Sequence, residues 1–291
     1  MKKAIFQNNE YQKQFDRDGF IKIKLFDAET ISQLAALCQQ HFPNDSEYFF
    51  SSSYLNDFEQ KQNISNQIIE LIRSQFQECF ADYRSIGAAF LIKGTGPKSE
   101  MPMHQDWTIV DESKFYALNV WIPLLETNEK NGTLEVMKGS HRWLNAKRAP
   151  TLPFPFQGHQ EKIKQHLSPI NTQLGEVVVL NQALIHYSKP NLSEQIRPAI
   201  TSGIVSKEAR LGLYYWDKEK SDGLELFEQE DDFLLKFENF HQSIFEKPKL
   251  GKSVGQTSYA IPSVNDQEID TYLGIAPTVQ KRSFFQRIFG K

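Results

Sequence analysis

The 291-residue sequence has few cysteines, no long apolar run and no excess of either charge. Its two cysteines, Cys38 and Cys79, are too few for a structural zinc site, and we expect them to be buried free thiols. No stretch approaches the roughly 18 consecutive apolar residues that span a bilayer. With 33 basic against 36 acidic residues, the chain also lacks the basic surplus typical of nucleic-acid binding.

The two ends of the chain add little to this. The first residues lack the apolar core of a secretory signal peptide, so we expect a cytoplasmic protein. The last stretch, Gln280–Lys291, is basic and aromatic. Our main interpretation is a small helix that packs its Phe side on the body, and contact with a membrane surface or a partner is the alternative. We expect no stable membrane insertion and no nucleic-acid partner.

The first 85 residues are expected to be mainly helical. Apolar residues at helical spacing predict helices over 10–18, 28–41 and 64–80, and Asp27 is placed to cap the second. The segment 19–25 alternates apolar and basic residues, which predicts one strand between the first two helices. This part should support the rest of a single domain.

From Ile86 onward, short apolar runs alternate with Gly, Pro, Asn and Asp. The predicted strands cover 86–92, 101–107, 116–123, 132–137, 176–180, 185–188, 199–206 and 211–216. About eight such strands over 86–216 indicate a jelly roll, a mostly β fold with flanking helices. The segment 144–167 interrupts them and is expected to be a lid or binding loop. Residues 217–291 are expected to form a helical C-terminal extension, with a helix over Glu228–Phe245.

Three of the seven histidines, His104, His141 and His186, lie in the strand-rich region. His104 and Asp106 are two residues apart, so on a strand they present an imidazole and a carboxylate on one face. These are two ligands of a facial metal triad, and a distant histidine must supply the third. His186 is the best candidate, because it opens a strand directly after a turn at 181–184. A His-x-Asp tripeptide by itself occurs in many proteins.

Arg197 strengthens this hypothesis. It follows His186 by 11 residues (197 − 186). A turn at 189–194 would fold the next strand back beside the strand of His186, so that Arg197 points into the same cavity. A guanidinium binds a carboxylate with two parallel hydrogen bonds and stays charged when buried. A metal triad with a nearby arginine suits a dicarboxylate that chelates the metal at its other end. The alternative for Arg197 is a surface ion pair.

With these residues in view, the sequence resembles the phytanoyl-CoA dioxygenase family of iron(II)/2-oxoglutarate oxygenases. The resemblance runs from Phe15 to about Trp216. It is carried by Met103-His-Gln-Asp-Trp107, Asn119-Val-Trp-Ile-Pro-Leu124, Asn131-Gly-Thr-Leu-Glu-Val136, Gly139-Ser-His-Arg142, Gly175-Glu176 and the segment from His186 through Ser188, Asn191 and Ser193 to Arg197.

The resemblance implies a double-stranded β-helix, the cupin-like form of the jelly roll. It implies that His104, Asp106 and His186 hold Fe(II), and that Arg197 binds the distal carboxylate of 2-oxoglutarate. With O2 as the other co-substrate, such an enzyme hydroxylates an unactivated C–H bond and releases succinate and CO2. The expected substrate is a small molecule or a carrier-linked one.

Other roles follow from the resemblance alone. Asn119 and Trp121 share one face of their strand, and in the family that face lines the cosubstrate pocket. Ser188 is implied to assist there. The family often has Lys-Pro-Pro ahead of the His-x-Asp strand, whereas this chain has Lys93-Gly-Thr-Gly-Pro97. His141 belongs to a turn, and we interpret it as structural.

Two groups of residues leave the substrate open. Aromatic side chains near the predicted pocket mouth either line it or pack in the core and rim: Trp107, Tyr116, Tyr214, Tyr215 and Trp216. Basic residues of the 144–167 segment either favour an anionic or carrier-linked substrate or form a solvated loop: Lys147, Arg148, Lys162 and Lys164. Two other functions stay open as well, a non-catalytic jelly roll that binds a metal and a carboxylate, and a zinc hydrolase that uses the same triad.

Overall fold

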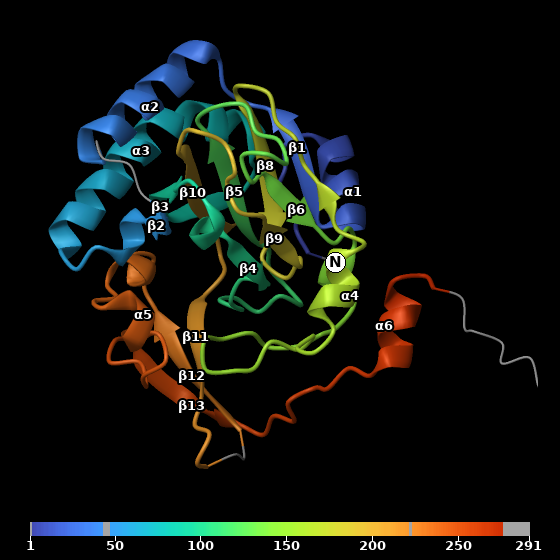
Figure 1. The fold of residues 1–291 in the computed structure, drawn as a ribbon. Coiled ribbons are helices and arrows are strands. Elements are labelled where there is room, and N and C mark those ends of the chain that lie inside the picture. Colours follow the sequence, from blue (N-terminus) through green and yellow to red (C-terminus); the bar gives the residue numbers. More distant parts are fainter. Residues whose placement is uncertain (1, 43–46, 221–222, 276–291) are drawn as a thin grey trace, which may run out of the picture.

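The computed structural model describes residues 2–42, 47–220 and 223–275, and its centre is a pair of antiparallel β-sheets (Figure 1). The larger sheet has the strand order β1-β8-β5-β10-β3-β2. Its strands are Phe20–Lys24 (β1), Phe49–Ser51 (β2), Tyr83–Lys93 (β3), Ala117–Pro123 (β5), Glu176–Asn181 (β8) and Arg197–Ser206 (β10). The smaller sheet has the order β4-β9-β6-β7. Its strands are Met101–His104 (β4), Leu134–Val136 (β6), Ser168–Pro169 (β7) and His186–Ser188 (β9).

Apolar side chains from both sheets share one core. Trp121, Val178 and Ala199 of the larger sheet pack in the same cluster as Leu134 and Val136 of β6. Side chains alternate along a strand, so each sheet turns one set of residues inward and the other outward. Two sheets packed in this way, with neighbours in space that are distant in sequence, form a jelly roll, which confirms the predicted fold class.

Three helices cover the outer face of the larger sheet: α1 (Asn9–Asp18), α2 (Ala28–His41) and α3 (Phe58–Cys79) (Figure 1). Their apolar faces join the outward residues of β1, β3, β8 and β10 in one large core cluster. Asp27 caps α2 as predicted, accepting a hydrogen bond from the Thr30 N–H. α3 starts earlier than the predicted residue 64, because Asp57 accepts from the Gln60 N–H and caps an additional first turn.

The prediction of a helical C-terminal extension, with a helix over Glu228–Phe245, is wrong. A third sheet pairs β11 (Leu211–Trp216), β12 (Leu224–Gln229) and β13 (Lys252–Thr257). Between β12 and β13 the chain forms two short helices, η4 (Phe233–Leu235) and α5 (Phe240–Ser243). The phenylalanines recur at helical spacing, but Asn239 between them adopts a φ of +47°, which no continuous right-handed helix allows.

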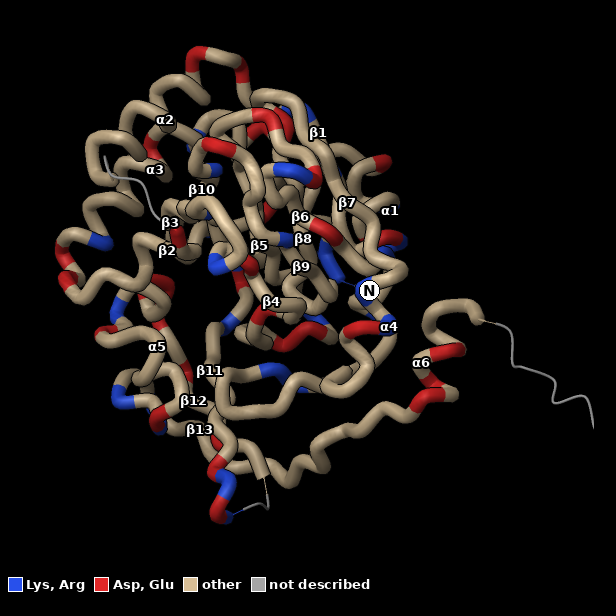
Figure 2. Tube along the Cα trace, viewed as in Figure 1, with Lys and Arg blue, Asp and Glu red and all other residues tan. Residues whose placement is uncertain are grey.

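The remaining short elements are η1 (Ser52–Tyr54), η2 (Pro97–Ser99), η3 (Ser140–Arg142), α4 (Gln160–Lys164) and α6 (Asp266–Tyr272). The basic stretch Gln280–Lys291 lies outside the described residues. Within them, no helix is both long enough and apolar enough to cross a membrane. Figure 2 shows basic and acidic residues intermingled along the chain. Cys38 and Cys79 are buried free thiols, as predicted.

Candidate metal centre

Two neighbouring strands of the smaller sheet bring two imidazoles together. β4 ends at His104 and β9 begins at His186, and these two residues are paired directly across the antiparallel ladder. Their ring centroids lie 4.2 Å apart. β9 begins at His186 directly after a turn, as predicted, which places this histidine at the strand end beside His104.

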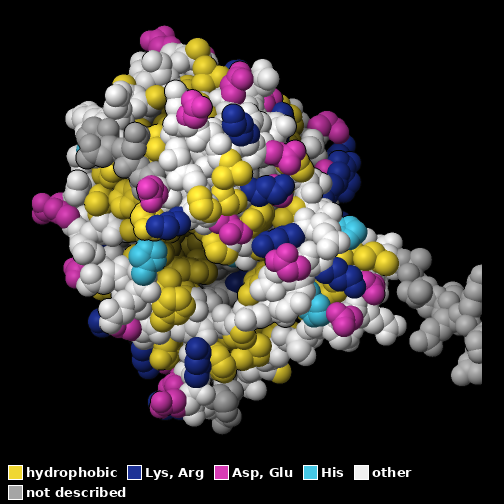
Figure 3. All heavy atoms as spheres, in the orientation of Figure 1, with side chains coloured by type: hydrophobic (Ala, Val, Ile, Leu, Met, Phe, Trp, Pro, Cys, Tyr) yellow, Lys and Arg dark blue, Asp and Glu magenta, His cyan; other side chains and the backbone are white. Residues whose placement is uncertain are grey.

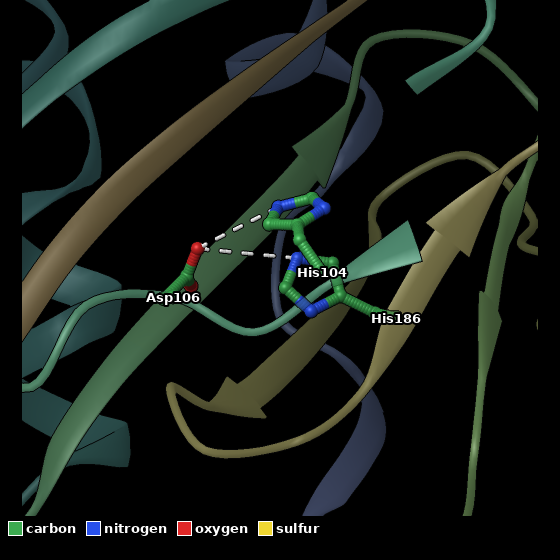
Figure 4. A group of neighbouring side chains, drawn as sticks. All are labelled: His104, Asp106 and His186. Atoms are coloured by element: carbon green, nitrogen blue, oxygen red, sulfur yellow. Dashed lines mark ion pairs between the residues drawn. The ribbon is translucent and has the colours of Figure 1, made fainter. Parts of the chain in front are cut away.

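Asp106 completes the group from a loop. The prediction that it shares a strand with His104 is wrong, because β4 ends at His104. Its carboxylate nevertheless faces both rings (Figure 4). Asp106 Oδ1 lies 3.8 Å from His104 Nε2 and 4.0 Å from His186 Nε2. One ligand atom from each of the three residues lies within 4.8 Å of the others, a geometry that can hold a metal ion.

Backbone carbonyls fix the orientation of both rings. The Nδ1–H of His104 donates to the Pro102 carbonyl at 2.7 Å, and that of His186 donates to the Leu184 carbonyl at 3.0 Å. When such a ring is neutral, its lone pair is on Nε2, the atom that faces Asp106. About 36% of the His104 side chain is exposed, but protein surrounds the ring. Burial, together with the charge of His186, lowers the pKa of His104 to about 4, so this ring is neutral at pH 7.

Polar neighbours hold the Asp106 carboxylate in place. The Nδ2 group of Asn119 donates to Asp106 Oδ2 at 3.4 Å. The hydroxyl of Thr201 donates to Asn119 Oδ1 at 2.6 Å and so sets the orientation of that amide. Asn119 therefore holds Asp106, a candidate metal ligand, in place. It also lies on the strand face that the resemblance assigns to the cosubstrate pocket.

Arg148 supports the same loop from the other side. Its Nε donates to the Asp106 carbonyl at 2.7 Å, and its two terminal nitrogens bind both oxygens of Glu112. Only 6% of the Arg148 side chain is exposed. The sequence left Arg148 either as a contact to an anionic substrate or as part of a solvated loop. Neither interpretation applies to Arg148, because it is buried and its donors are already bound. Lys162 and Lys164 pair with Asp270 and Glu161 instead.

The donor set fits iron(II). Two imidazole Nε2 atoms and one carboxylate oxygen converge from one side, with their other atoms already hydrogen-bonded. Two histidines and one carboxylate on one face of the metal are the ligand set of non-haem iron(II) oxygenases, and they leave the remaining coordination positions open.

Arg197 reaches the interior from the opposite wall. The predicted hairpin that sets its strand beside β9 is wrong, because β10 pairs with β3 and β5 of the larger sheet. β9 pairs with β4 and β6 of the smaller sheet. Between β9 and β10 the chain crosses from the smaller sheet to the larger one, so His186 and Arg197 lie on facing sheets.

The Arg197 guanidinium is a buried cation with unused donors. The residue is 2% exposed, and its Cζ lies 5.2 Å from the centre of the Trp121 ring. Nε and Nη1 have no hydrogen-bond partner among the described residues. Burial lowers the pKa of Arg197 to about 9, so it still carries its charge at pH 7. A buried charge with unpaired donors is costly, and a carboxylate bound to the guanidinium would reduce that cost.

One face of β5 lies between the candidate metal ligand Asp106 and the Arg197 guanidinium. Asn119 and Trp121 are two residues apart on β5; the first contacts Asp106 and the second lies under Arg197. At about 3.4 Å per residue the two positions are roughly 7 Å apart, a length that a five-carbon oxo-diacid can span. This arrangement agrees with the cosubstrate face that the resemblance implied.

Ser188 and Lys93 belong to the wall behind this face. The Ser188 hydroxyl donates to the Gly132 carbonyl at 2.8 Å, so its hydrogen is committed to the fold. Gly132 has a φ of +71°, and a Cβ there would lie 2.5 Å from the Lys189 carbonyl oxygen, which leaves room only for glycine. Lys93 is completely buried and donates to the carbonyls of Ser99, Ser188 and Lys189.

Sequence reasoning gave Lys93 no role of its own. The signal available was its place at the end of an apolar strand, directly before a glycine-rich segment. Its three donors meet three backbone carbonyls, at 2.6, 3.3 and 2.8 Å, so it has none left for a ligand. We conclude that Lys93 ties together β3, η2 and the end of β9.

His141 lies away from the metal ligands, as predicted. Its Nε2 is 3.1 Å from the Asp16 carbonyl, which joins the η3 turn to α1. Of the aromatic candidates, Trp107 lines an apolar cavity beside Asp106. Tyr116 does not, because its hydroxyl donates to Asp16 at 2.6 Å and its ring packs in the outer core.

Comparisons with known proteins agree with this fold and donor set. Residues 15–199 match the phytanoyl-CoA dioxygenase (PhyH) family, so the chain belongs to that family. It is 24% identical over 123 residues to "Phytanoyl-CoA dioxygenase domain-containing protein 1 homolog" of Dictyostelium discoideum, covering 40% of this chain and 44% of that one. It is 26% identical over 133 residues to "Dioxygenase olcK" of Penicillium canescens, covering 43% and 40%. The chain thus spans less than half the length of these curated relatives.

The fold also has a solved counterpart. The crystal structure of the non-heme alpha ketoglutarate dependent carbocyclase SnoK from nogalamycin biosynthesis superposes with a TM-score of 0.51 at 15% identity. The superposition covers 70% of this chain and 86% of that one. This likeness supports the jelly-roll assignment.

Proposed function

We propose that this protein is an iron(II)/2-oxoglutarate-dependent dioxygenase that hydroxylates an unactivated C–H bond of a small-molecule or carrier-linked substrate. The observation that carries the proposal is the pairing of two features inside one jelly roll. A His-Asp-His donor set converges on one wall, and a buried arginine with unused donors lies on the facing wall. Membership in the family supports the same reaction class.

In this proposal the chain's own residues bind and orient. His104 and His186 would hold the metal through Nε2, and Asp106 through its carboxylate. Arg197 would bind the distal carboxylate of 2-oxoglutarate through its guanidinium, which has donors without a partner among the described residues. Bound iron(II), with 2-oxoglutarate and O2, would supply the oxidising chemistry, releasing succinate and CO2. Trp121 shields the guanidinium and keeps water away from it.

Succinate release tests the proposal. Purified protein with Fe(II), 2-oxoglutarate and O2 is incubated with a panel of metabolites, and succinate above the substrate-free background is measured. We expect His104→Ala and Asp106→Ala to abolish it, because each removes one metal ligand. His166→Ala, an exposed histidine outside the site, is the matched control and should keep full activity.

Three outcomes would reject the proposal. Undiminished succinate release by both alanine variants would exclude the triad. Tight 2-oxoglutarate binding without turnover across the panel would favour a binding module, and turnover of a substrate under argon would favour a hydrolase.

A further inference from the structure

An apolar cavity opens beside Asp106. Its volume is about 210 Å³. Asp106 and Asn119 form one end, and the wall runs along β3 and β10 past Ala89 and Gly203. Of the three candidate metal ligands, only Asp106 lines it. A group bound in the cavity therefore meets the metal centre from the side of Asp106.

The far side of the cavity comes from the C-terminal part of the chain. Phe240 of α5 stacks on Trp107, with ring centroids 6.2 Å apart and planes 9° from parallel. Leu234 and Leu235 of η4 add to the same wall. Figure 3 shows hydrophobic side chains that line a hollow near α5. These three residues lie beyond residue 199, where the family match ends.

The cavity has no cationic side chain. Among the described residues that line it, Asp106 is the one ionisable group. An anionic substrate group placed here would be desolvated without a partner, which is strongly unfavourable. The polar side chains already have partners: Thr201 donates to Asn119, and Asn119 donates to Asp106. The cavity therefore suits an uncharged group.

Gln182 gives this apolar cavity one polar contact. The residue follows β8, is 7% exposed and lines the cavity. Its side-chain Oε1 is buried and has no hydrogen-bond partner among the described residues. A buried carbonyl without a donor costs about 1–3 kcal/mol. A hydroxyl or N–H on a bound molecule would remove that cost.

The volume limits the size of the group. An apolar cavity of about 150 Å³ takes up benzene. A cavity of about 210 Å³ holds one substituted six-membered ring, or a branched chain of similar bulk. Parts of the substrate beyond that ring must lie outside.

We infer that this cavity is the substrate subsite, and that it takes a neutral, ring-sized apolar group with one hydrogen-bond donor directed at Gln182. Trp107 and Phe240 determine the specificity of the subsite by packing against the bound ring. The inference rests on the proposed oxygenase function, because it assigns the reacting part of the substrate to this space. A charged carrier, if there is one, stays outside.

Three one-ring probes test it: phenol, toluene and benzoate. Their binding to the metal-free protein is measured by saturation-transfer NMR titration. We expect phenol to bind at millimolar concentration, toluene several-fold more weakly and benzoate at least ten-fold more weakly. Gln182→Leu should remove the preference of phenol over toluene. Phe240→Ala and Trp107→Ala should each weaken phenol binding at least five-fold, whereas Phe245→Ala, an exposed residue of the same segment, should not.

The outcomes separate the two proposals. Equal binding of phenol and benzoate, absent phenol binding, or unchanged phenol binding in Phe240→Ala would overturn the subsite. The Phe240 side chain is partly exposed, so that variant should fold even if Trp107→Ala does not. Succinate release without phenol binding leaves the oxygenase standing and rejects the subsite. Phenol binding with the expected variant pattern but no succinate release supports the subsite and rejects the oxygenase.

Discussion

The two ends of the interior differ in charge although the same two strands build both. At one end, β3 contributes Lys93 and β10 contributes Arg197, which are paired across the ladder. Four residues further along β10, Thr201 is paired with Ala89, and the wall becomes small and uncharged. Because strand side chains alternate with period 2, one face of a strand pair can carry charged residues at one end and an apolar wall at the other.

The two ends also differ in how they are closed. The charged end is sealed: Lys93 and Arg197 are each 2% exposed or less. Its residues all fall inside the family match, 15–199. The apolar end is completed by Phe240 and its neighbours beyond that match. The two ends therefore differ in their relation to the family match, since part of the apolar end lies outside it.

Changing Arg197 should separate the two ends most clearly. We expect Arg197→Leu to weaken 2-oxoglutarate binding about 100-fold, because losing a buried charge pair costs about 3 kcal/mol. The measurement is the KM for 2-oxoglutarate from succinate release. Phenol binding at the apolar end should not change.

The stability of Arg197→Leu supplies the control. In the ligand-free protein, the substitution removes buried donors that have no partner, so the free energy of unfolding in urea should not fall. An unchanged KM for 2-oxoglutarate would remove Arg197 from the cosubstrate site. A KM that rises together with a large loss of stability would mean that Arg197 supports the fold instead.

The sequence predicted the three candidate metal ligands because their signals are local. His104 and Asp106 lie in one tripeptide, and His186 follows a recognisable strand and turn. Arg197 is buried in the interior, but the predicted hairpin that would bring it beside His186 is wrong. Spacing along the chain does not say whether a strand pairs with its predecessor or crosses to the other sheet, which long-range contacts decide.

The supporting residues could not be predicted in the same way. Sequence analysis gave Lys93 no role and left Arg148 as either a solvated residue or a substrate contact. Burial of a long basic side chain depends on carbonyls and carboxylates supplied by distant segments. The C-terminal phenylalanines gave a helical period, yet Phe237 and Phe240 pack on Trp107 rather than along one helix. Tertiary contacts overrode the local pattern there.

Changing Arg148 tests the support of the Asp106 loop at the candidate metal centre. We expect Arg148→Met to weaken metal binding about 10-fold, because it frees the loop that carries Asp106. The affinity for Co(II) is measured by competition with a fluorescent chelator. Lys147→Met is the matched control and should bind Co(II) normally, since the Lys147 ammonium lies over Tyr214 instead. Equal Co(II) affinity in both variants would show that the Asp106 loop does not need Arg148.

Lys93 gives a further test, in which the expected effect depends on pH. Burial, with the charge of Arg197 beside it, lowers the pKa of Lys93 to about 7 from its usual 10.5. Between these values the unfolded chain binds more protons than the folded one, so stability rises with pH. The free energy of unfolding of the wild type, minus that of Lys93→Met, should therefore increase from pH 7 to pH 9 in urea titrations. It should increase more than the same difference for Lys98→Met, an exposed lysine nearby. A difference that stays flat or falls would show that the three carbonyls hold Lys93 fully charged, and that the charged end keeps both of its cations over this pH range.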